Sequence, residues 1–173
     1  IQGRSLCFEP IGGTWPSQYT RQTPVPYYVN PSSAPVGFLD AVNAAFNAWN
    51  AAAIAGNADI RFLFAGTTIR YWSDHVDGFN VVSWDAPPVD HPNLLETGDA
   101  AVTDLSPLEI FQGESIQDAD ITFNGEWNFS IGGSTDTKDL RVVVLHEVGH
   151  FVGLNHVPDG SPSVMVRGNL SLT

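Results

Sequence analysis

The pattern of hydrophobic positions predicts a long helix between two strands in the first third of the chain. From residue 37 to residue 56, apolar residues recur at spacings of three and four, which places them on one face of a helix. We expect Gly56 to end this helix in a left-handed conformation. Residues 25–29 and 60–65 are short β-branched and aromatic runs that predict strands. A strand, a helix and a strand in this order predict a parallel crossover. The apolar stripe consists of Phe38, Val42, Ala45, Phe46, Trp49 and Ala53.

Three further strands are predicted after this unit. Val81 and Val82 form a short apolar run inside a loop-rich stretch, residues 67–92. Residues 99–105 and 118–124 are two more strand candidates, and in the second of them apolar and polar positions alternate. In each strand with alternation, one face should point into the core. The expected inward positions are Ile60, Phe62 and Phe64 in one strand, and Ile121 and Phe123 in another.

A second helix is predicted near the end of the chain, where a broad apolar surface would bury it against the sheet. Asp136 or Thr137 is a suitable N-cap residue. The valines at positions 142–144 favour a strand locally, but burial of the helix overrides that preference. The apolar surface consists of Leu140, Val143, Val144, Val148, Phe151 and Val152.

Composition and charge limit the classes of function. The chain has 173 residues, 43% of them hydrophobic, which is enough for one domain with a sizeable core. We expect residues 1–21 to form an extended N-terminal arm or the remnant of a prosegment, and residues 22–173 to form the functional domain. The net charge of −12 would repel nucleic acid and anionic membrane surfaces, so we expect neither as a partner. The acidity and the low lysine content favour an exported protein, and we expect a monomer.

The candidate chemistry lies in the segment from His146 to His156. Residues four positions apart lie on one face of a helix, so His146 and His150 can bind the same metal ion. Glu147 lies on the same side and can reach a water molecule beside the ion, which is the position of a general base. A continuous helix would carry His156 to the opposite side. Gly153 therefore has to end the helix with a positive φ and return the chain toward the ion.

Three imidazoles and one open position form a catalytic rather than a structural zinc site. We therefore expect His146, His150 and His156 to be the metal ligands. Other zinc enzymes use a glutamate or an aspartate as the third ligand. A glutamate as third ligand, as in thermolysin-like enzymes, is excluded because no glutamate follows Glu147. Asp159 could serve as third ligand, but its position relative to Gly153 is less natural than that of His156.

The HExxHxxGxxH pattern, followed by Ser163-Val164-Met165, resembles the metzincin metallopeptidases with their Met-turn. Over residues 22–167 the chain is most similar to matrixin-type catalytic domains, including compact bacterial ones. The resemblance implies an α+β zincin fold: a twisted mixed sheet of about five strands, a long N-terminal helix, an active-site helix and a Met-turn. It also implies a secreted zinc endopeptidase acting on proteins or peptides, with residues 120–124 in the edge strand that pairs with the substrate.

The chain departs from the matrixin pattern at three places. His75-Val76-Asp77 matches part of the structural zinc site of the family, but the later histidines of that site are replaced. Asp74, Asp77, Asp118 and Asp120 could instead bind calcium or remain solvated. Cys7 precedes the domain like the cysteine that blocks the zinc in matrixin zymogens, although the switch motif around it is missing. The C-terminal helix of the family would be missing or shortened.

One alternative function comes from a different class. The chain could be a zinc-stabilised binding module, or a latent form in which the open zinc position is blocked. The presence of Glu147 argues against a loss of catalysis.

Overall fold

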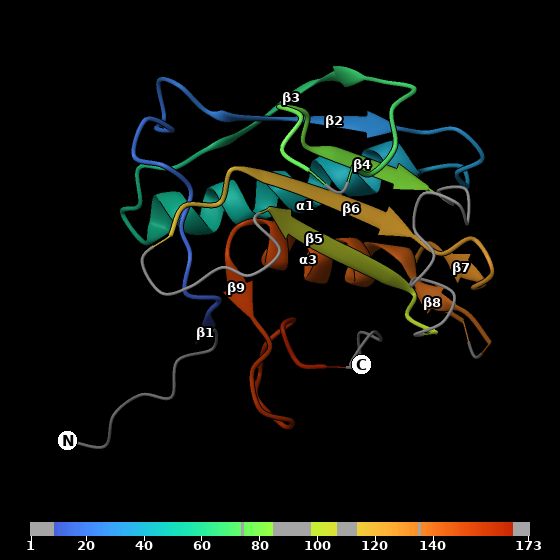
Figure 1. Ribbon diagram of the computed structural model, residues 1–173. Helices are drawn as coiled ribbons and strands as arrows, with labels where there is room; N and C mark the ends of the chain where they lie inside the picture. The colour runs from blue at the N-terminus through green and yellow to red at the C-terminus, as the bar shows by residue number, and fades with distance from the viewer. Residues whose placement is uncertain (1–8, 74, 85–97, 107–113, 135, 168–173) are drawn as a thin grey trace.

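The computed structural model describes residues 9–73, 75–84, 98–106, 114–134 and 136–167, and Figure 1 shows how they are arranged. Two residues of the sequence predictions, Cys7 and Asp74, lie outside the described residues. No helix in the described ranges is long and apolar enough to cross a membrane.

The centre of the fold is a five-stranded mixed sheet with the order β3-β2-β4-β6-β5. The strands are β2 (Val25–Asn30), β3 (Phe62–Thr67), β4 (Val81–Trp84), β5 (Ala101–Ser106) and β6 (Asp118–Phe123). β2 pairs in parallel with β3 and β4, β4 pairs in parallel with β6, and β5 is antiparallel to β6. The predicted α+β class and the parallel crossover are confirmed. The edge position is corrected: β6 lies inside the sheet, between β4 and β5, and β5 forms the edge.

The two helices of the described residues lie behind the sheet in the view of Figure 1, on one face, and they contact each other. These are α1 (Phe38–Ala55) and α3 (Leu140–Phe151). The core between helices and sheet is rich in aromatic rings. The ring of Tyr27 on β2 stacks on Phe46 of α1 at 3.7 Å, and Phe151 of α3 meets Phe46 edge to face at 5.0 Å. This packing explains the predicted apolar stripe and fixes α3 against the sheet.

The ends of the helices differ from the predictions. Gly56 has φ −83°, so it does not adopt the left-handed conformation; Asn57, with φ 56°, adopts it instead. The N-cap of α3 is Asp139, whose side chain accepts a hydrogen bond from the Arg141 N–H at 3.0 Å. The prediction of Asp136 or Thr137 as the N-cap was wrong. β8 (Lys138–Asp139) pairs with β7 (Phe129–Ser130), and this pairing keeps the backbone extended up to Asp139.

The strand predicted at residues 60–65 begins two residues later, at Phe62. Asn50 of α1 fixes this start, because its side chain bonds both the N–H and the carbonyl of Phe62. Phe62 is buried, whereas Phe64 is 36% exposed, so the expected inward face holds only at the beginning of the strand. The reason is that β3 is an edge strand and has a register shift opposite Tyr27 and Tyr28.

Two short strands lie below the sheet in Figure 1, close to the end of α3. β1 (Glu9–Pro10) is antiparallel to β9 (Leu154–Asn155). β9 follows α3 after only a short turn, so the N-terminal segment runs beside the segment that leads to His156.

Candidate metal centre

The structure brings the three predicted histidines together. His146 and His150 project from α3, and their Nε2 atoms are 3.1 Å apart. Nε2 of His156 lies 3.1 Å from that of His146 and 3.2 Å from that of His150. Among the described His, Cys, Asp and Glu residues, this trio is the group arranged so that it could hold a metal ion.

Gly153 makes the turn that the sequence demanded. Its φ is +101°, and the helix ends just before it with hydrogen bonds from the Val152 and Gly153 N–H groups to Val148 and His150. A Cβ at Gly153 would lie 3.4 Å from the carbonyl oxygen of Gly13, which is an ordinary van der Waals contact. The positive φ therefore requires glycine at this position, and not a lack of space.

Backbone carbonyls fix the protonation of two imidazoles. Nδ1 of His146 lies 2.7 Å from the carbonyl oxygen of Val164, and Nδ1 of His150 lies 2.8 Å from that of Leu154. A carbonyl only accepts, so each neutral ring carries its proton on Nδ1 and presents a lone pair at Nε2. No proton therefore lies between these two Nε2 atoms, although they are only 3.1 Å apart. A cation bound by both lone pairs would make this close approach favourable.

The electrostatics also favour neutral imidazoles. Burial is the largest cause that lowers the pKa of each of the three rings, and for His150 burial together with the charge of His146 lowers the pKa to about 4. Neutral imidazole is the form that binds metal. Nitrogen ligands at about 2.0–2.1 Å around a tetrahedral zinc ion lie about 3.3 Å apart. The observed separations of 3.1 to 3.2 Å fit that geometry.

Glu147 lies beside the trio and is 6% exposed. Its Oε2 accepts a hydrogen bond from the hydroxyl of Thr103 on β5 at 2.7 Å. Burial raises the pKa of Glu147 to about 7, the Thr103 hydroxyl lowers it, and the charges of Asp99 and Asp104 raise it. Glu147 can therefore both accept and release a proton near neutral pH.

Two apolar side chains, Met165 and Trp49, pack closely against α3 at Gly149. A Cβ at Gly149 would lie 2.2 Å from Sδ of Met165 and 3.1 Å from a ring carbon of Trp49. Met165 is fully buried, and its carbonyl accepts a hydrogen bond from the Val157 N–H at 3.0 Å. Met165 thus lies against the helix segment that carries both histidines, and Gly149 is needed for that contact.

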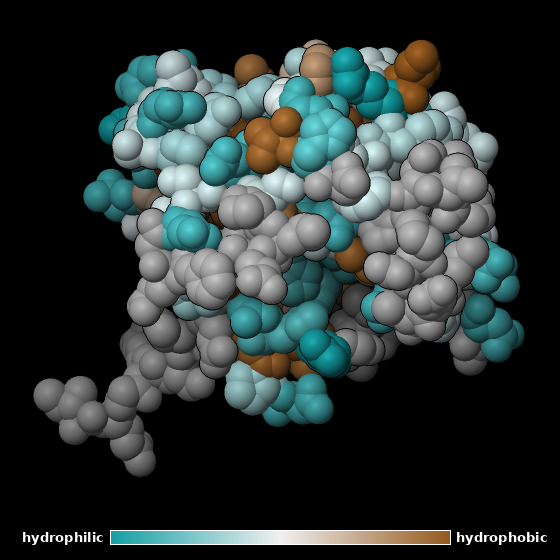
Figure 2. All heavy atoms as spheres, in the orientation of Figure 1, coloured by the Kyte–Doolittle hydropathy of each residue, from teal (hydrophilic) through white to brown (hydrophobic). Residues whose placement is uncertain are grey.

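A cavity of about 440 Å³ opens in front of the three histidines and Glu147. Figure 2 shows hydrophilic side chains in a hollow in the lower half of the view, below the region of β5. Its walls come from β5, from the N-terminal segment through Ile11 and from the end of the described chain through Arg167.

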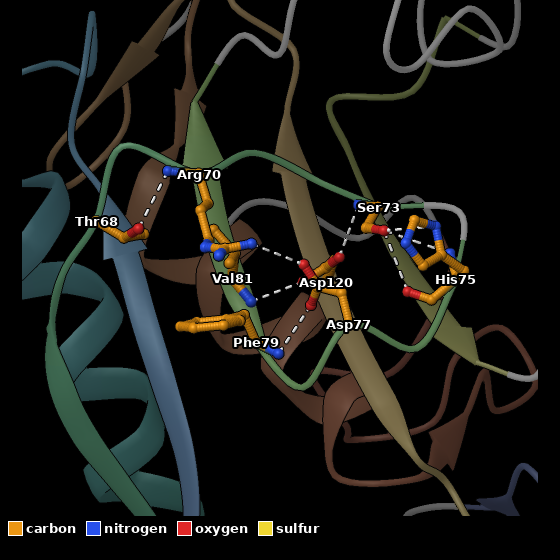
Figure 3. Close-up of polar contacts among 8 residues, drawn as sticks. All are labelled: Thr68, Arg70, Ser73, His75, Asp77, Phe79, Val81 and Asp120. Atoms are coloured by element: carbon orange, nitrogen blue, oxygen red, sulfur yellow. Dashed lines mark hydrogen bonds and ion pairs between the residues drawn. The ribbon is translucent and has the colours of Figure 1, made fainter.

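The second group of predicted metal ligands lies away from the trio, around β4 and β6 (Figure 3). The carboxylate of Asp120 accepts hydrogen bonds from the Val81 N–H at 2.7 Å and the Ser73 N–H at 3.0 Å. Asp77 accepts from the Phe79 N–H and pairs with Arg70 at 3.2 Å. No metal-holding group is found among these described aspartates, so they give no support to a calcium site.

Burial changes the acidity of two of these aspartates. It raises the pKa of Asp118 to about 6, although the backbone amides of Asp77 and Ala119 lower it. It raises the pKa of Asp120 to about 8, against the amides of Val81 and Ser73. One oxygen of Asp118 has no hydrogen-bond partner among the described residues.

Sequence reasoning missed the groups that support the trio. Thr103 and the carbonyls of Leu154 and Val164 contact the functional side chains directly. A backbone carbonyl leaves no signal in the sequence. For Thr103 the sequence predicts only that it lies in a strand, residues 99–105. The spacing of the histidines does not indicate that Thr103 contacts Glu147.

The comparisons with known proteins agree with this geometry. No curated protein matches the chain. The model of the matrixin family matches residues 24–168, which is most of the chain and includes all three histidines, Glu147 and Met165. The chain belongs to the matrixin family of peptidases, and the general activity that this membership implies is that of a zinc-dependent metalloendopeptidase.

Proposed function

We propose that the chain is a zinc endopeptidase in which His146, His150 and His156 hold the ion and Glu147 is the general base. The observation that carries the proposal is the convergence of three Nε2 atoms, 3.1 to 3.2 Å apart. While both rings are neutral, the Nδ1–carbonyl contacts of His146 and His150 also leave no proton between their Nε2 atoms. No other described group of side chains offers such a donor set.

A bound zinc ion would polarise the carbonyl of the scissile bond and make a water molecule more acidic. Glu147 takes the proton of the attacking water on its carboxylate and returns it to the leaving amine. The Thr103 hydroxyl at 2.7 Å holds one carboxylate oxygen in place, which leaves the other for the proton transfer. The pKa of about 7 that burial gives Glu147 suits a group that must do both.

The substrate would be an extended polypeptide that pairs with the edge of β5. β5 bonds only β6 among the described strands, and its residues 101–103 line the cavity beside Glu147. Backbone pairing with a strand edge holds a peptide without regard to its side chains.

Residues 22–173 would form the catalytic domain, and we propose that the protein acts outside the cell, as matrixins typically do.

The second candidate function is a latent or inactive zinc-binding form. Latency through Cys7 stays a prediction, because Cys7 lies outside the described residues. A protein that binds zinc and cleaves nothing, even after thiol modification, would favour this alternative over the peptidase.

The test is a pair of matched glutamate variants. Glu147→Gln keeps the shape of the side chain and removes the base, so casein cleavage should fall by about 10²- to 10⁴-fold while one zinc per chain remains bound. Glu126→Gln changes an exposed glutamate and should alter neither property. Undiminished cleavage by Glu147→Gln, or loss of its zinc, would contradict the assigned role.

A further inference from the structure

We infer that the N-terminal segment, residues 10–15, is a positioning element of the metal centre: it holds the turn after α3 and so orients His150 and His156. The inference rests on the metal site of the proposed function. The segment lies before the start of the family match at residue 24, so membership of the matrixin family does not account for it.

The segment bonds the turn directly. The Ile11 N–H donates to the carbonyl of Gly153 at 2.9 Å, and Pro10 is the register partner of Leu154 in the β1–β9 pair. The carbonyl oxygen of Gly13 packs against the position where Gly153 has no side chain. The segment therefore contacts Gly153 of the turn and Leu154 directly after it.

Trp15 forms a hydrogen bond with the C-terminal end of α3. It is 6% exposed, and its indole N–H donates to the carbonyl of Phe151 at 2.9 Å. Phe151 is the last residue of α3, where carbonyls have no partner within the helix. The ring of Trp15 also lies 5.4 Å from that of Phe151. The indole thus satisfies a carbonyl that the helix itself leaves unpaired.

The other side of the segment is fixed to the chain that enters β6. The Thr14 N–H donates to the carbonyl of Glu114 at 3.1 Å, and the Ile116 N–H donates to the carbonyl of Thr14 at 2.9 Å. Ile116 is fully buried. The segment is held on both sides, by the chain that enters β6 and by the turn, so it can transmit the position of β6 to β9.

β9 carries the groups that orient two ligands. The carbonyl of Leu154 faces Nδ1 of His150 at 2.8 Å, and His156 follows β9 directly. Groups that orient the ligands from outside the metal's own shell typically change metal affinity by 10–100-fold when they are removed. Residues 10–15 act one step further out, through the turn and β9, and Trp15 and Ile11 are positioning residues.

The test compares two variants that each lose one hydrogen bond and keep an aromatic ring. Trp15→Phe removes the indole donor to Phe151. Tyr27→Phe removes the hydroxyl donor to Asn43 at 2.8 Å, between β2 and α1, and serves as the control for lost stability. Zinc affinity is measured by competition with a chromophoric chelator. We expect about tenfold weaker zinc binding for Trp15→Phe and a change within about twofold for Tyr27→Phe. Equal affinity of both variants would overturn the inference.

Hydrogen exchange in the unaltered protein decides the question if Trp15→Phe does not fold. Coupling between two sites is reciprocal, so zinc must tighten the segment if the segment strengthens zinc binding. The Ile11 and Ile116 amides should exchange more slowly with zinc, by a larger factor than the Thr68 amide, which bonds Val29 at the other edge of the sheet. Equal factors would overturn the inference.

The two proposals fail separately. A protein that binds zinc but cleaves no peptide would refute the peptidase and leave the positioning role intact. A zinc peptidase whose Trp15→Phe variant binds zinc like the unaltered protein would refute only the positioning role.

Discussion

Two partly buried polar clusters in this fold face opposite kinds of backbone group. In the histidine trio, carbonyls contact Nδ1 of His146 and His150 from outside, so the Nε2 lone pairs point at one another. In the aspartate cluster around β6, backbone N–H groups point at Asp77 and Asp120 and occupy their oxygens. In the first cluster the Nε2 lone pairs remain free for a cation. In the second, the carboxylate oxygens of Asp77 and Asp120 accept hydrogen bonds from the backbone of their own loop.

The comparison teaches that residue type alone does not make a metal site. Asp77 and Asp120 are good ligands in chemical terms, yet their carboxylates are bound to the loop between residues 73 and 81 (Figure 3). The backbone that surrounds a side chain decides whether its lone pairs remain available.

The largest effect is expected at the trio itself. His150→Ala removes one of the three ligands. Zinc affinity should therefore fall by more than the roughly 10–100-fold that is typical when a group that only orients a ligand is removed. His75→Ala, which removes an exposed imidazole in the aspartate loop, should leave zinc affinity unchanged. Zinc binding is measured by chelator competition. An equal loss in the two variants would erase the difference between the clusters.

Gly149→Ala tests the close packing of Met165 against α3. The added Cβ would overlap Sδ of Met165, so we expect the free energy of unfolding to fall by about 1–3 kcal/mol, as for overpacked cores. Gly56→Ala is the control, because its φ of −83° suits alanine and its nearest contact is 3.4 Å. Urea unfolding of the metal-free proteins measures both. A neutral Gly149→Ala would mean that Met165 is not packed as described.

Asp120→Ala tests the aspartate cluster. It leaves the Val81 and Ser73 N–H groups without their acceptor, which should cost about 1–3 kcal/mol of unfolding free energy. Zinc affinity should not change, because the cluster supports a loop away from the trio. A loss of zinc together with the loss of stability would show that the two clusters are coupled.

The smallest effect concerns pH. Burial raises the pKa of Asp118 to about 6, so the folded protein holds this proton more tightly than the unfolded chain. Its contribution to stability is fully present below the unfolded pKa, near 4, and is lost as pH rises through 6. Asp118→Asn does not titrate, so its stability relative to the unaltered protein should increase between pH 4 and 6 and then level off.

Thermal unfolding of the metal-free proteins at several pH values measures this difference, and Asp136→Asn, at an exposed position, is the control. A pH-independent difference between Asp118→Asn and the unaltered protein would contradict the raised pKa.

The sequence predicted the parts of the fold whose pattern is local. The stripe in α1, the need for a turn at Gly153 and the strands at residues 25–29 and 118–124 depend on periodicity or on the geometry of one segment. The error at Gly56 is local, because the left-handed conformation falls on Asn57 instead, whereas two other errors came from contacts between different segments. Asp139 replaces Asp136 or Thr137 as N-cap because β7 and β8 pair, and β5 rather than β6 is the edge because of the order of the sheet.

The same division applies to the site. The spacing of His146, His150 and His156 follows from the helix and one glycine, so the sequence alone could predict their approach. The groups that orient them are two carbonyls, a threonine on β5 and the indole of Trp15. They come from segments whose positions only the folded chain defines.

X-ray absorption at the zinc edge tests the central claim most directly. In zinc-loaded protein the account predicts three imidazole nitrogens at about 2.0–2.1 Å from the ion. The spectrum of the His156→Ala variant should have one imidazole fewer. A spectrum that showed fewer than three imidazoles in the unaltered protein, or one that did not change in His156→Ala, would contradict the account.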